Sequence, residues 1–392
     1  MNKRGVRDLD VRGKKVLVRV DFNVPVEDGR VTDDTRIKRT LPTIRYLLER
    51  GARPVLISHL GRPKGETDPE FAMDPVARRL EELLEAPVLK LDAAVGEEVE
   101  EALANFSEGV VLLENSRFYP GETENDPEFS KQLASLADLY VDDAFGAAHR
   151  AHATTVGAAE LLPAAAGLLM EEELDSLDKI MRSPERPFVA ILGGSKVSDR
   201  LGVIESMLEV ADTLLLGGAM CFTFFKAKGF ETGNSLVEDE YLEEAKRLME
   251  EAGEKLVLPV DVVAAEKMEE DAPSKVVKVE EFPADLMGLD IGPETVEEFR
   301  GYIADAKTIF WNGPMGVFEI DAFAKGTEGV ARAVAESGAV SVVGGGDSVA
   351  AVRKLGLEND IGFISTGGGA SLEYVEGKKL PGIAVLPDKE ES

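Results

Sequence analysis

The sequence of 392 residues has few cysteines, histidines, aromatic residues and positive charges. Its only cysteine, Cys221, excludes an internal disulfide and is expected to be a buried, unreactive thiol in a reducing, intracellular setting. Lys and Arg number 44 against 74 Asp and Glu, a formal net charge of −30. Because a polyanion partner needs a clustered basic surface, nucleic acid is not expected as a partner. Such acidity instead indicates a demand for solubility, as in a saline cytoplasm.

Long apolar segments are also missing. No apolar run approaches the roughly 20 residues that a membrane helix needs, and the N-terminus lacks the apolar core of a signal peptide. We therefore expect a soluble, cytoplasmic protein without a membrane partner. The hydrophobic fraction of 44% excludes a disordered chain, and the length favours two domains.

Short runs of Val, Ile and Leu alternate with amphipathic stretches, which predicts an α/β fold with parallel sheets and crossover helices. One unit consists of a strand in 14–25, a helix in 35–51 and a strand in 52–63. The helix carries four apolar residues on one face: Ile37, Leu41, Ile44 and Leu48. A second unit of the same kind has a strand in 187–196, a helix in 197–212 and a strand from 213. Residues 255–265 and three later segments are expected to be further strands.

The pattern predicts two doubly wound, Rossmann-like domains joined by a hinge helix. We expect an N-terminal domain at 1–165, an interdomain helix at 166–182, a C-terminal domain at 183–375 and a tail at 376–392. The helix is expected from Met170, Leu174, Leu177 and Met181, which share a helical face. Apolar residues in the tail predict that it docks on the rest of the protein.

Ligands of open α/β sheets bind beyond the carboxyl ends of the strands. In the N-terminal half these positions are polar and cationic: Asp21, Asn23, His59, Arg62, Asn115, Arg117, His149 and Arg150, with Arg36 at the start of the first helix. Four arginines at one rim of an acidic protein predict a site for a small multivalent anion, since Arg presents a planar fork to carboxylate or phosphate oxygens. The alternative is that each arginine pairs with a nearby surface acid.

In the C-terminal half the same positions hold glycines: Gly193–Gly194, Gly217–Gly218, Gly313, Gly316, Gly344–Gly346 and Gly367–Gly369. Glycine permits close approach and exposes N–H groups that can bind phosphate. The patterns GxxxxGK[ST] and GxGxxG are absent, so neither a Walker P-loop nor the usual dinucleotide fingerprint is present.

Lys196 and Arg200 are four residues apart and are expected on one face in the first turns of the helix that follows Gly193–Gly194. Like charges there, near the positive end of the helix dipole, are unfavourable unless a polyanion binds. Asp347 is the metal candidate, because one carboxylate plus substrate phosphates is the usual way to hold Mg²⁺. A zinc site at His149 and His152 would lack further ligands at useful spacing.

An anion site in one half and a phosphate-binding surface in the other predict phosphoryl transfer between a small acid and a nucleotide. A carboxylate acceptor is ionised at neutral pH and needs no general base. Catalysis then consists of in-line positioning and neutralisation of the charge on the transferred group.

Eight motifs, RVDFNVP, SHLGRP, DAFGAAHRAHAT, LGGSKVSD, MGLD, WNGPMGVFE, GGGDS and STGGGASLE, resemble those of phosphoglycerate kinases in order and spacing over nearly the whole chain. The resemblance implies reversible transfer between 1,3-bisphosphoglycerate and ADP, giving 3-phosphoglycerate and ATP with Mg²⁺. It further implies a monomeric hinge enzyme whose N-terminal domain binds phosphoglycerate, whose C-terminal domain binds the nucleotide, and whose tail returns to the N-terminal domain.

By motif position, the resemblance implies a role for each site residue. Phosphoglycerate would be bound by Asp21, Phe22, Asn23, Arg36, His59, Leu60, Gly61, Arg62, Arg117 and Arg150. The transferred phosphoryl group would be stabilised by Arg36, Lys196, Arg200 and the backbone at Gly346 and Gly369. The nucleotide would be bound by Lys196, Arg200, Gly217, Gly218, Gly288, Asn312, Pro314, Val317, Glu319, Gly345, Gly346, Asp347 and Ser348, with the metal at Asp347.

The sequence departs from the commonest family pattern at two of these places. Arg200 stands where Lys is more usual, and Ser116 replaces an apolar residue beside Arg117, where it is expected to loosen the support of that arginine. Two rival functions are a catalytically silent relative that binds nucleotide or phosphoglycerate, and a nicotinamide-dependent dehydrogenase. Arg36 and Lys196 argue against the first, and the missing GxGxxG argues against the second.

Overall fold

The computed structural model describes residues 2–63 and 65–389, so Met1, Lys64 and the last three residues of the expected tail lie outside it. The chain forms two compact units. Unit 1 runs to Asp175 and includes the segment from Lys379, and unit 2 is Ser176–Lys378. Both are α/β, which confirms the predicted fold class. Helix α7 (Leu168–Arg182) contains the division, and in it Ile180 is buried instead of the expected Met181.

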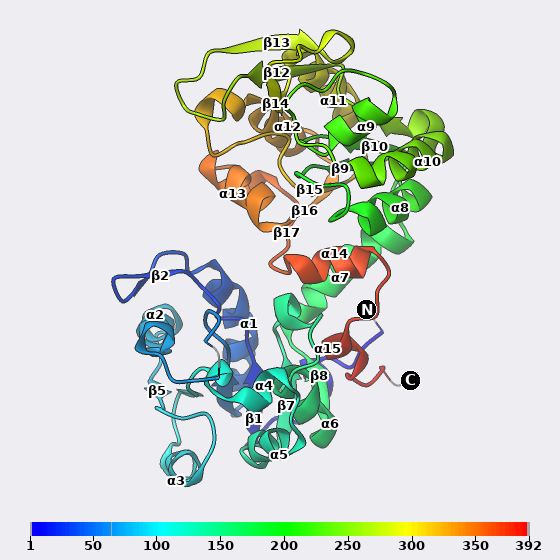
Figure 1. Cartoon of the computed structure of the whole chain (residues 1–392). Coiled ribbons are helices and arrows are strands. Elements are labelled where there is room, and N and C mark those ends of the chain that lie inside the picture. Colours follow the sequence, from blue (N-terminus) through cyan, green and yellow to red (C-terminus); the bar gives the residue numbers. More distant parts are fainter. Residues whose placement is uncertain (1, 64, 390–392) are drawn as a thin grey trace. The chain divides into compact units, whose positions relative to one another are not determined.

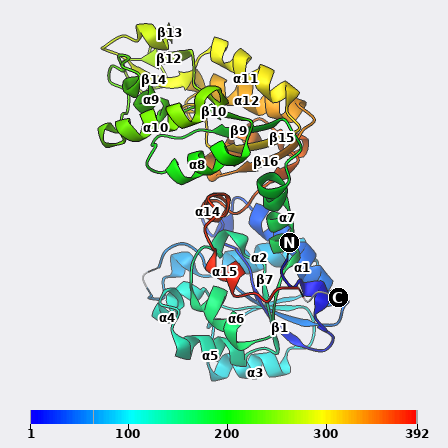
Figure 2. The ribbon, with the colours of Figure 1, turned by 90° about the vertical axis from the view of Figure 1, so that its right-hand side faces the viewer.

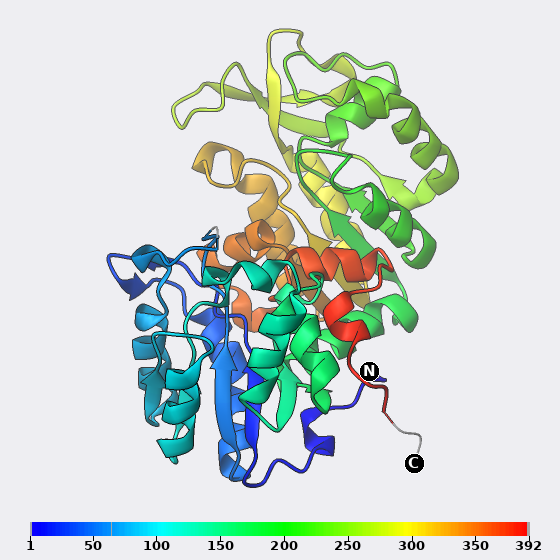
Figure 3. The same cartoon turned by 60° about the horizontal axis from the view of Figure 1, so that its bottom comes forward.

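Unit 1 contains a sheet of six parallel strands in the order β5-β6-β4-β1-β7-β8, flanked by helices (Figure 3). The strands are β1 (Lys15–Arg19), β4 (Arg53–Ile57), β5 (Val88–Lys90), β6 (Val110–Leu112), β7 (Leu139–Asp142) and β8 (Ala164–Ala166). The helices are α1 (Thr35–Glu49), α2 (Asp74–Leu84), α3 (Glu97–Asn105), α4 (Pro120–Thr123), α5 (Pro127–Ser135) and α6 (Ala158–Leu161). A short hairpin consists of β2 (Val26–Glu27) and β3 (Arg30–Val31).

Helix α1 buries the apolar face that its spacing predicts. Ile37, Leu41 and Ile44 lie in the core of unit 1. Leu47 continues this buried face, whereas Leu48, expected there, is only partly buried at its edge. Because an α-helix has 3.6 residues per turn, the apolar face shifts gradually around the helix axis, and both Leu47 and Leu48 contact the core.

The C-terminal segment packs on unit 1 through helix α15 (Pro381–Ala384). Leu380 and Leu386 are buried, and the Gly382 N–H donates to the carbonyl of Ala148 over 2.9 Å. Lys3 forms a β-bridge with Asp388, so the segments near the two chain ends lie side by side (Figure 1).

Unit 2 contains six parallel strands in the order β11-β10-β9-β15-β16-β17. The strands are β9 (Phe188–Leu192), β10 (Thr213–Leu216), β11 (Leu256–Val257), β15 (Thr308–Asn312), β16 (Val340–Gly344) and β17 (Phe363–Ile364). The helices are α8 (Leu201–Val210), α9 (Cys221–Ala227), α10 (Leu242–Ala252), α11 (Pro293–Asp305), α12 (Lys325–Glu336), α13 (Gly346–Lys354) and α14 (Gly369–Val375). From β9 the chain builds the sheet outward in both directions, and right-handed crossovers therefore put helices on both faces. Figure 2 shows α11 and α12 on one face and α8 and α10 on the other.

A small antiparallel sheet in unit 2 differs from the sequence prediction. It consists of β13 (Ser274–Lys278), β12 (Asp261–Ala265) and β14 (Met287–Ile291), in that order. The strand structure expected in 255–265 is present, but the segment divides at Pro259 into β11 and β12, which belong to different sheets. Proline has no N–H to donate to a ladder, so a strand readily ends there.

The strands β9 and β15 are neighbours in the sheet, although three strands of the small sheet lie between them in sequence. Beyond their carboxyl ends the two loops approach so closely that only glycine fits. A Cβ on Gly193 would lie 2.0 Å from the carbonyl oxygen of Pro314, and one on Gly313 would lie 2.2 Å from that of Gly193. In an open α/β sheet this reversal of strand order is where ligands bind. Among the described residues, no helix is both long and apolar enough to cross a bilayer.

Candidate ligand-binding and catalytic sites

The first candidate site lies beyond the carboxyl ends of β1, β4, β6 and β7 in unit 1. The structure places the sequence-predicted residues there: Asp21, Phe22 and Asn23 after β1, His59, Leu60, Gly61 and Arg62 after β4, Arg117 after β6, and Arg150 after β7. Arg36 is the second residue of α1. The central strand β1 lies between β4 and β7, so the sheet extends from β1 in both directions.

Hydrogen bonds fix the loops of this site to one another. The side-chain oxygen of Asn23 accepts from the Gly61 N–H over 2.8 Å. The buried amide of Asn115 accepts from the Leu60 N–H and donates to the Leu60 carbonyl. Its oxygen also accepts from the Arg117 N–H. Asn115 therefore positions Arg117 and is itself fully bonded.

Within the described part of the chain, only one of the four predicted arginines pairs with an acid. Arg36 Nη1 donates to Asp21 Oδ2 over 2.7 Å. The Arg117 guanidinium donates to the Gly61 carbonyl over 2.6 Å, and Arg150 contacts the ring of His149. Exposed Arg62 forms no hydrogen bond or ion pair with any described residue. The alternative in which each arginine serves a surface ion pair thus holds for Arg36 alone.

These positive charges act on one another. Burial, together with the charges of Arg150 and Arg19, lowers the pKa of Arg117 to about 10. Burial and the neighbouring guanidinium groups likewise hold the pKa of His59 well below its usual value. A cluster whose charges disfavour one another is stabilised when a multivalent anion binds.

Arg19 is a member of this cluster that the sequence interpretation missed. It is 1% exposed in β1, and its Nη2 donates to His59 Nδ1 over 2.8 Å. Arg can only donate, so Nδ1 of the neutral imidazole accepts and its proton is assigned to Nε2. Arg19 Nε and Nη1 are buried without a partner among the described residues. The available signal was an arginine inside the apolar run VLVRV.

The hydroxyl of Ser116 has a hydrogen-bond partner, so it does not loosen the support of Arg117 as an unpartnered polar group would. Ser116 is fully buried, and its hydroxyl donates to Glu122 Oε1 over 3.3 Å. The Thr154 hydroxyl donates to the same oxygen over 2.6 Å, and the Thr154 N–H donates to Oε2 over 3.0 Å. Three donors thus compensate the buried Glu122, whose negative charge favours the charged form of Arg117.

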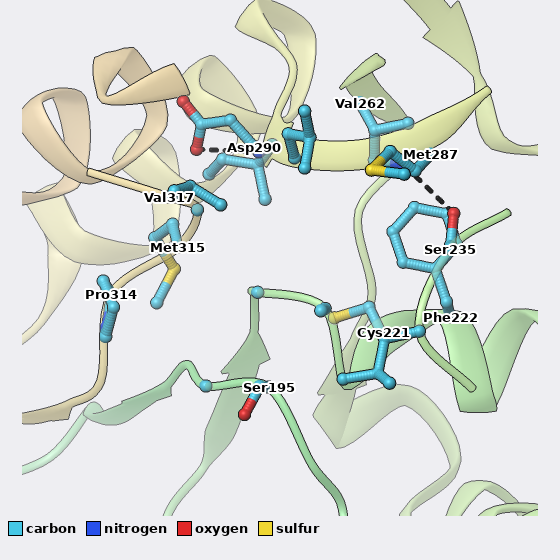
Figure 4. A pocket seen from close by; sticks show the side chains of 18 of the residues that line it. Ser195, Cys221, Phe222, Ser235, Val262, Met287, Asp290, Pro314, Met315 and Val317 are labelled. Carbon is cyan, nitrogen blue, oxygen red and sulfur yellow. Dashed lines mark hydrogen bonds between the residues drawn. The ribbon is translucent and has the colours of Figure 1, made fainter. Parts of the chain in front are cut away.

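The second candidate site is a cavity of about 1020 Å³ in unit 2, beyond the ends of β9 and β15 (Figure 4). Of the predicted residues, its walls contain Lys196, Arg200, Gly218, Gly288, Pro314, Val317, Glu319 and Asp347. Gly217, Asn312, Gly345, Gly346 and Ser348 lie outside its lining, and Gly369 lies outside it as well. A pocket of this size holds a small-molecule ligand.

One end of the cavity is apolar. Phe222, Val262, Met287 and Val317 contribute side chains to it (Figure 4). The Phe222 ring packs against the backbone of Gly288, where a Cβ would lie 1.9 Å from its Cζ. An apolar slot with few polar groups suits a flat heterocycle such as a nucleobase. Sequence reasoning missed Phe222 and Met287, because apolar wall residues have the same composition as core residues.

The opposite end is cationic, but Lys196 and Arg200 do not share a helical face as expected. Lys196 lies in the loop before α8, and Arg200 is the N-cap of that helix. The helix begins at Leu201 because residues 197–200 form a tight turn, in which the Arg200 N–H donates to the Val197 carbonyl over 2.9 Å. Burial lowers the pKa of Arg200 from its ordinary value. Neither the Lys196 ammonium nor the Arg200 guanidinium forms a hydrogen bond or ion pair with a described residue.

Helix α13 begins at Gly346, directly after β16. The predicted residue Ser348 is buried there, and its hydroxyl accepts from the Gly313 N–H over 2.6 Å. Asn312 is fully buried beside Gly345, and its two side-chain polar atoms have no partner among the described residues. Buried polar groups are normally bonded, so the Asn312 amide is a candidate for ligand contact.

Gly346 and Gly369 are the first residues of α13 and α14. A Cβ on either would have no atom within 4 Å, and neither residue has a positive φ. The fold of unit 2 therefore does not itself require glycine at these positions. The open space beside both residues leaves room for a ligand to approach the backbone.

Asp290 lines the cavity from β14 and is almost fully buried. Its carboxylate accepts from the Gly326 N–H over 2.6 Å and the Ile291 N–H over 2.9 Å. Burial nevertheless raises the pKa of Asp290 to about 7. The Val317 N–H donates to the Leu289 carbonyl, so β14 holds the loop that carries Val317, a residue of the cavity wall.

The donor set fits Mg²⁺ in one specific way. Among the described residues, no group of three or more His, Cys, Asp or Glu side chains could hold a metal ion. Asp347 is an exposed single carboxylate in the first turn of α13. One carboxylate completed by ligand phosphates is the usual mode for Mg²⁺. Cys221 is buried as expected, and burial raises the pKa of its thiol, so it is unreactive.

Comparison with known proteins identifies the family. The family model for phosphoglycerate kinase matches residues 6–378. The chain is 75% identical over 391 residues to a phosphoglycerate kinase of Rubrobacter xylanophilus, covering 100% of both chains. It is 57% identical to that of Dictyoglomus turgidum, covering 98% of both. The solved phosphoglycerate kinase of Coxiella burnetii has a TM-score of 0.88 at 42% identity, and that of Pyrococcus horikoshii 0.84 at 35%, each over 98% of both chains. The chain therefore belongs to the phosphoglycerate kinase family.

Proposed function

We propose that the chain catalyses reversible, Mg²⁺-dependent phosphoryl transfer between 1,3-bisphosphoglycerate and ADP, giving 3-phosphoglycerate and ATP. The chain is a phosphotransferase of the glycolytic kinase family, with a carboxyl group as acceptor. The observation that supports this proposal best is that both units of a protein with net charge −30 contain cations that form no ion pair with a described acid.

Phosphoglycerate is assigned to the unit 1 site. Arg62, Arg117 and Arg150 form no ion pair with a described acid, which leaves their charges for carboxylate and phosphate oxygens. The Nε2–H of neutral His59 supplies a further donor. Asp21 orients Arg36, whose second role is to neutralise charge on the transferred group.

The nucleotide is assigned to the unit 2 cavity. The base occupies the apolar slot beside Phe222 and Gly288, and the phosphates extend toward Lys196 and Arg200. Gly217, Gly218, Asn312, Pro314, Val317, Glu319, Gly345 and Ser348 belong to this nucleotide assignment. The backbone N–H groups at Gly346 and Gly369 would face the transferred phosphoryl oxygens.

No side chain has to remove a proton in this reaction, because the acceptor carboxylate is already ionised. The chain contributes alignment of the two ligands and preorganised positive charge from Arg36, Lys196 and Arg200. Asp347 would hold Mg²⁺, which supplies charge neutralisation on the nucleotide phosphates when bound. We further propose that the enzyme acts in the cytoplasm as a monomer.

The direct test is transfer from Mg-ATP to 3-phosphoglycerate, followed through a coupled reductive step at low salt and in molar KCl. Turnover in either buffer is the expected result, and turnover only in KCl would connect the acidic surface with a saline cytoplasm. Folded protein that binds both ligands without turnover would contradict the proposal and favour a silent binding protein.

A further inference from the structure

Lys196 depends on its neighbours for its position. It is exposed and forms no hydrogen bond or ion pair with any described residue. The loop is held on either side of it. Before Lys196, the Met220 N–H donates to the Gly194 carbonyl over 3.1 Å. After it, Ser198 is held by a carboxylate from a distant segment of unit 2.

That carboxylate belongs to Glu238, which is 9% exposed. The Ser198 N–H donates to Glu238 Oε2 over 3.0 Å, and the Ser198 hydroxyl donates to Oε1 over 2.6 Å. Both oxygens of one carboxylate therefore bind the backbone and the side chain of a single residue. Hydrogen bonds to an ionised acceptor are roughly twice as strong as neutral ones, and two of them fix orientation as well as distance.

Glu238 is itself anchored. Its N–H donates to the hydroxyl of Thr223, which is 1% exposed in α9. The preceding residue, Val237, lines the nucleotide cavity, whereas Glu238 is not part of the lining. A continuous series of hydrogen bonds thus connects a buried helix and one cavity wall with the loop that carries Lys196.

We propose that Glu238 is a positioning residue for turnover, acting on Lys196 through Ser198. This inference rests on the catalytic role proposed above for Lys196. Without the two bonds, the loop keeps buried Val197 and its bond to the Arg200 N–H but loses the contacts that orient Ser198. A displacement of about 1 Å at a reacting centre can lower the rate roughly 100-fold. Loss of Glu238 should therefore lower kcat while the KM for ATP changes little.

A double-mutant cycle tests the proposal in the full-length enzyme. We expect Lys196→Ala to lower kcat by about 100-fold or more, as for loss of one preorganised charge. Glu238→Ala should lower kcat about 10-fold in the wild-type background and less than threefold in the Lys196→Ala background, because residues that act as one unit are not additive. Equal losses in both backgrounds, or a loss below threefold in the wild type, would overturn the proposal.

Two further substitutions at position 238 separate geometry from charge. In Glu238→Gln the side-chain oxygen can accept from the Ser198 N–H while the amide donates to the Ser198 hydroxyl, so kcat should stay within about threefold. Glu238→Asp keeps the charge but is one methylene shorter and cannot reach both groups, so kcat should fall as in Glu238→Ala. The aspartate variant also serves if Glu238→Ala does not fold. The opposite order, with Asp active and Gln inactive, would contradict positioning.

Asp261 provides a matched control elsewhere in unit 2. It is 2% exposed, and its Oδ1 accepts from the Thr295 N–H over 2.8 Å and the Thr295 hydroxyl over 2.7 Å. Asp261 Oδ2 also accepts from the Glu294 N–H over 3.1 Å, so Asp261→Ala removes a comparable set of backbone and hydroxyl bonds to a buried carboxylate without touching the Lys196 loop. If it lowers kcat as much as Glu238→Ala, loss of stability explains both results and the proposal is wrong. If Lys196→Ala leaves kcat within threefold, the proposed role of Lys196 fails as well, and that variant alone identifies this case.

Discussion

Replacement of Arg36 separates the catalytic proposal from a structural one. Arg36 is bonded to Asp21 over 2.7 Å, and the two side chains are 34% and 11% exposed. Ion pairs with this much water contribute about 1 kcal/mol or less to folding. For a chain with units of this size, that amounts to a fall in melting temperature of only about 2–4 °C. Arg36→Ala should therefore stay folded.

The catalytic effect should be much larger. Loss of one preorganised group that stabilises developing charge lowers kcat by about 100- to 1000-fold, or about 3–4 kcal/mol. The nucleotide cavity is lined entirely by residues of unit 2, so the affinity for ADP should change less than about twofold. Arg36→Lys keeps the charge but loses the planar fork, and should recover only part of the rate.

Steady-state turnover and calorimetric titration with ADP measure the two quantities on the same preparation. Lys38→Ala is the matched control, because Lys38 is on the same helix and forms an exposed ion pair with Asp34 over 2.9 Å. This control should retain full turnover. A loss of kcat below threefold in Arg36→Ala, or an equal loss in ADP affinity, would refute the role assigned to Arg36.

Three further changes test other parts of the structure. Gly313→Ala puts a Cβ 2.2 Å from the Gly193 oxygen at a φ of +93°, so it should destabilise the protein by about 3 kcal/mol and weaken ADP binding. An unchanged melting temperature would contradict the close approach. Because burial raises the pKa of Asp290 to about 7, the native state keeps a proton that the unfolded state loses above about pH 4, and stability should fall as pH rises toward 7. In Asp290→Asn the fall in unfolding free energy between pH 5 and 7 should be shallower by up to about 1.4 kcal/mol per pH unit, and equal slopes would contradict the raised pKa. Ser116→Ala removes a donor to buried Glu122 and should raise the KM for 3-phosphoglycerate severalfold with an unchanged KM for ATP, whereas a change in both would point to general destabilisation.

Much of the fold could be predicted because parallel strands are buried on both faces and form continuous apolar runs. PFVAIL in β9 and TIFW in β15 are such runs, and each is followed by glycines that mark the strand end. The small antiparallel sheet was not predicted. Its strand β13 is mostly exposed and carries lysines, so its sequence has no apolar period that distinguishes it from a loop.

The site could be predicted where its residues are charged and follow a strand. It could not be predicted where contacts between distant segments decide the structure. Because a tight turn precedes α8, Lys196 lies in a loop and not on the helix. The hydrogen bonds from Ser198 to Glu238 that stabilise this loop connect residues 40 positions apart. No local spacing contains that information.

The presence or absence of an ion pair separates the cations proposed to bind ligand from the structural cations of this chain. With 74 acidic residues against 44 basic ones, a cation on the surface has an acid nearby in most places, and Arg79 and Arg247 each form ion pairs with two or more acids. Arg62, Lys196 and Arg200 have no such partner among the described residues, although sequence alone cannot separate them from Arg79. In a strongly acidic protein, a cation without an ion pair requires placement by the fold, because random placement would pair it. Among the described residues these three cations form no ion pair, although the charges of Asp199, Asp347 and Glu376 act on Arg200, and this leaves their hydrogen-bond donors for an incoming anion.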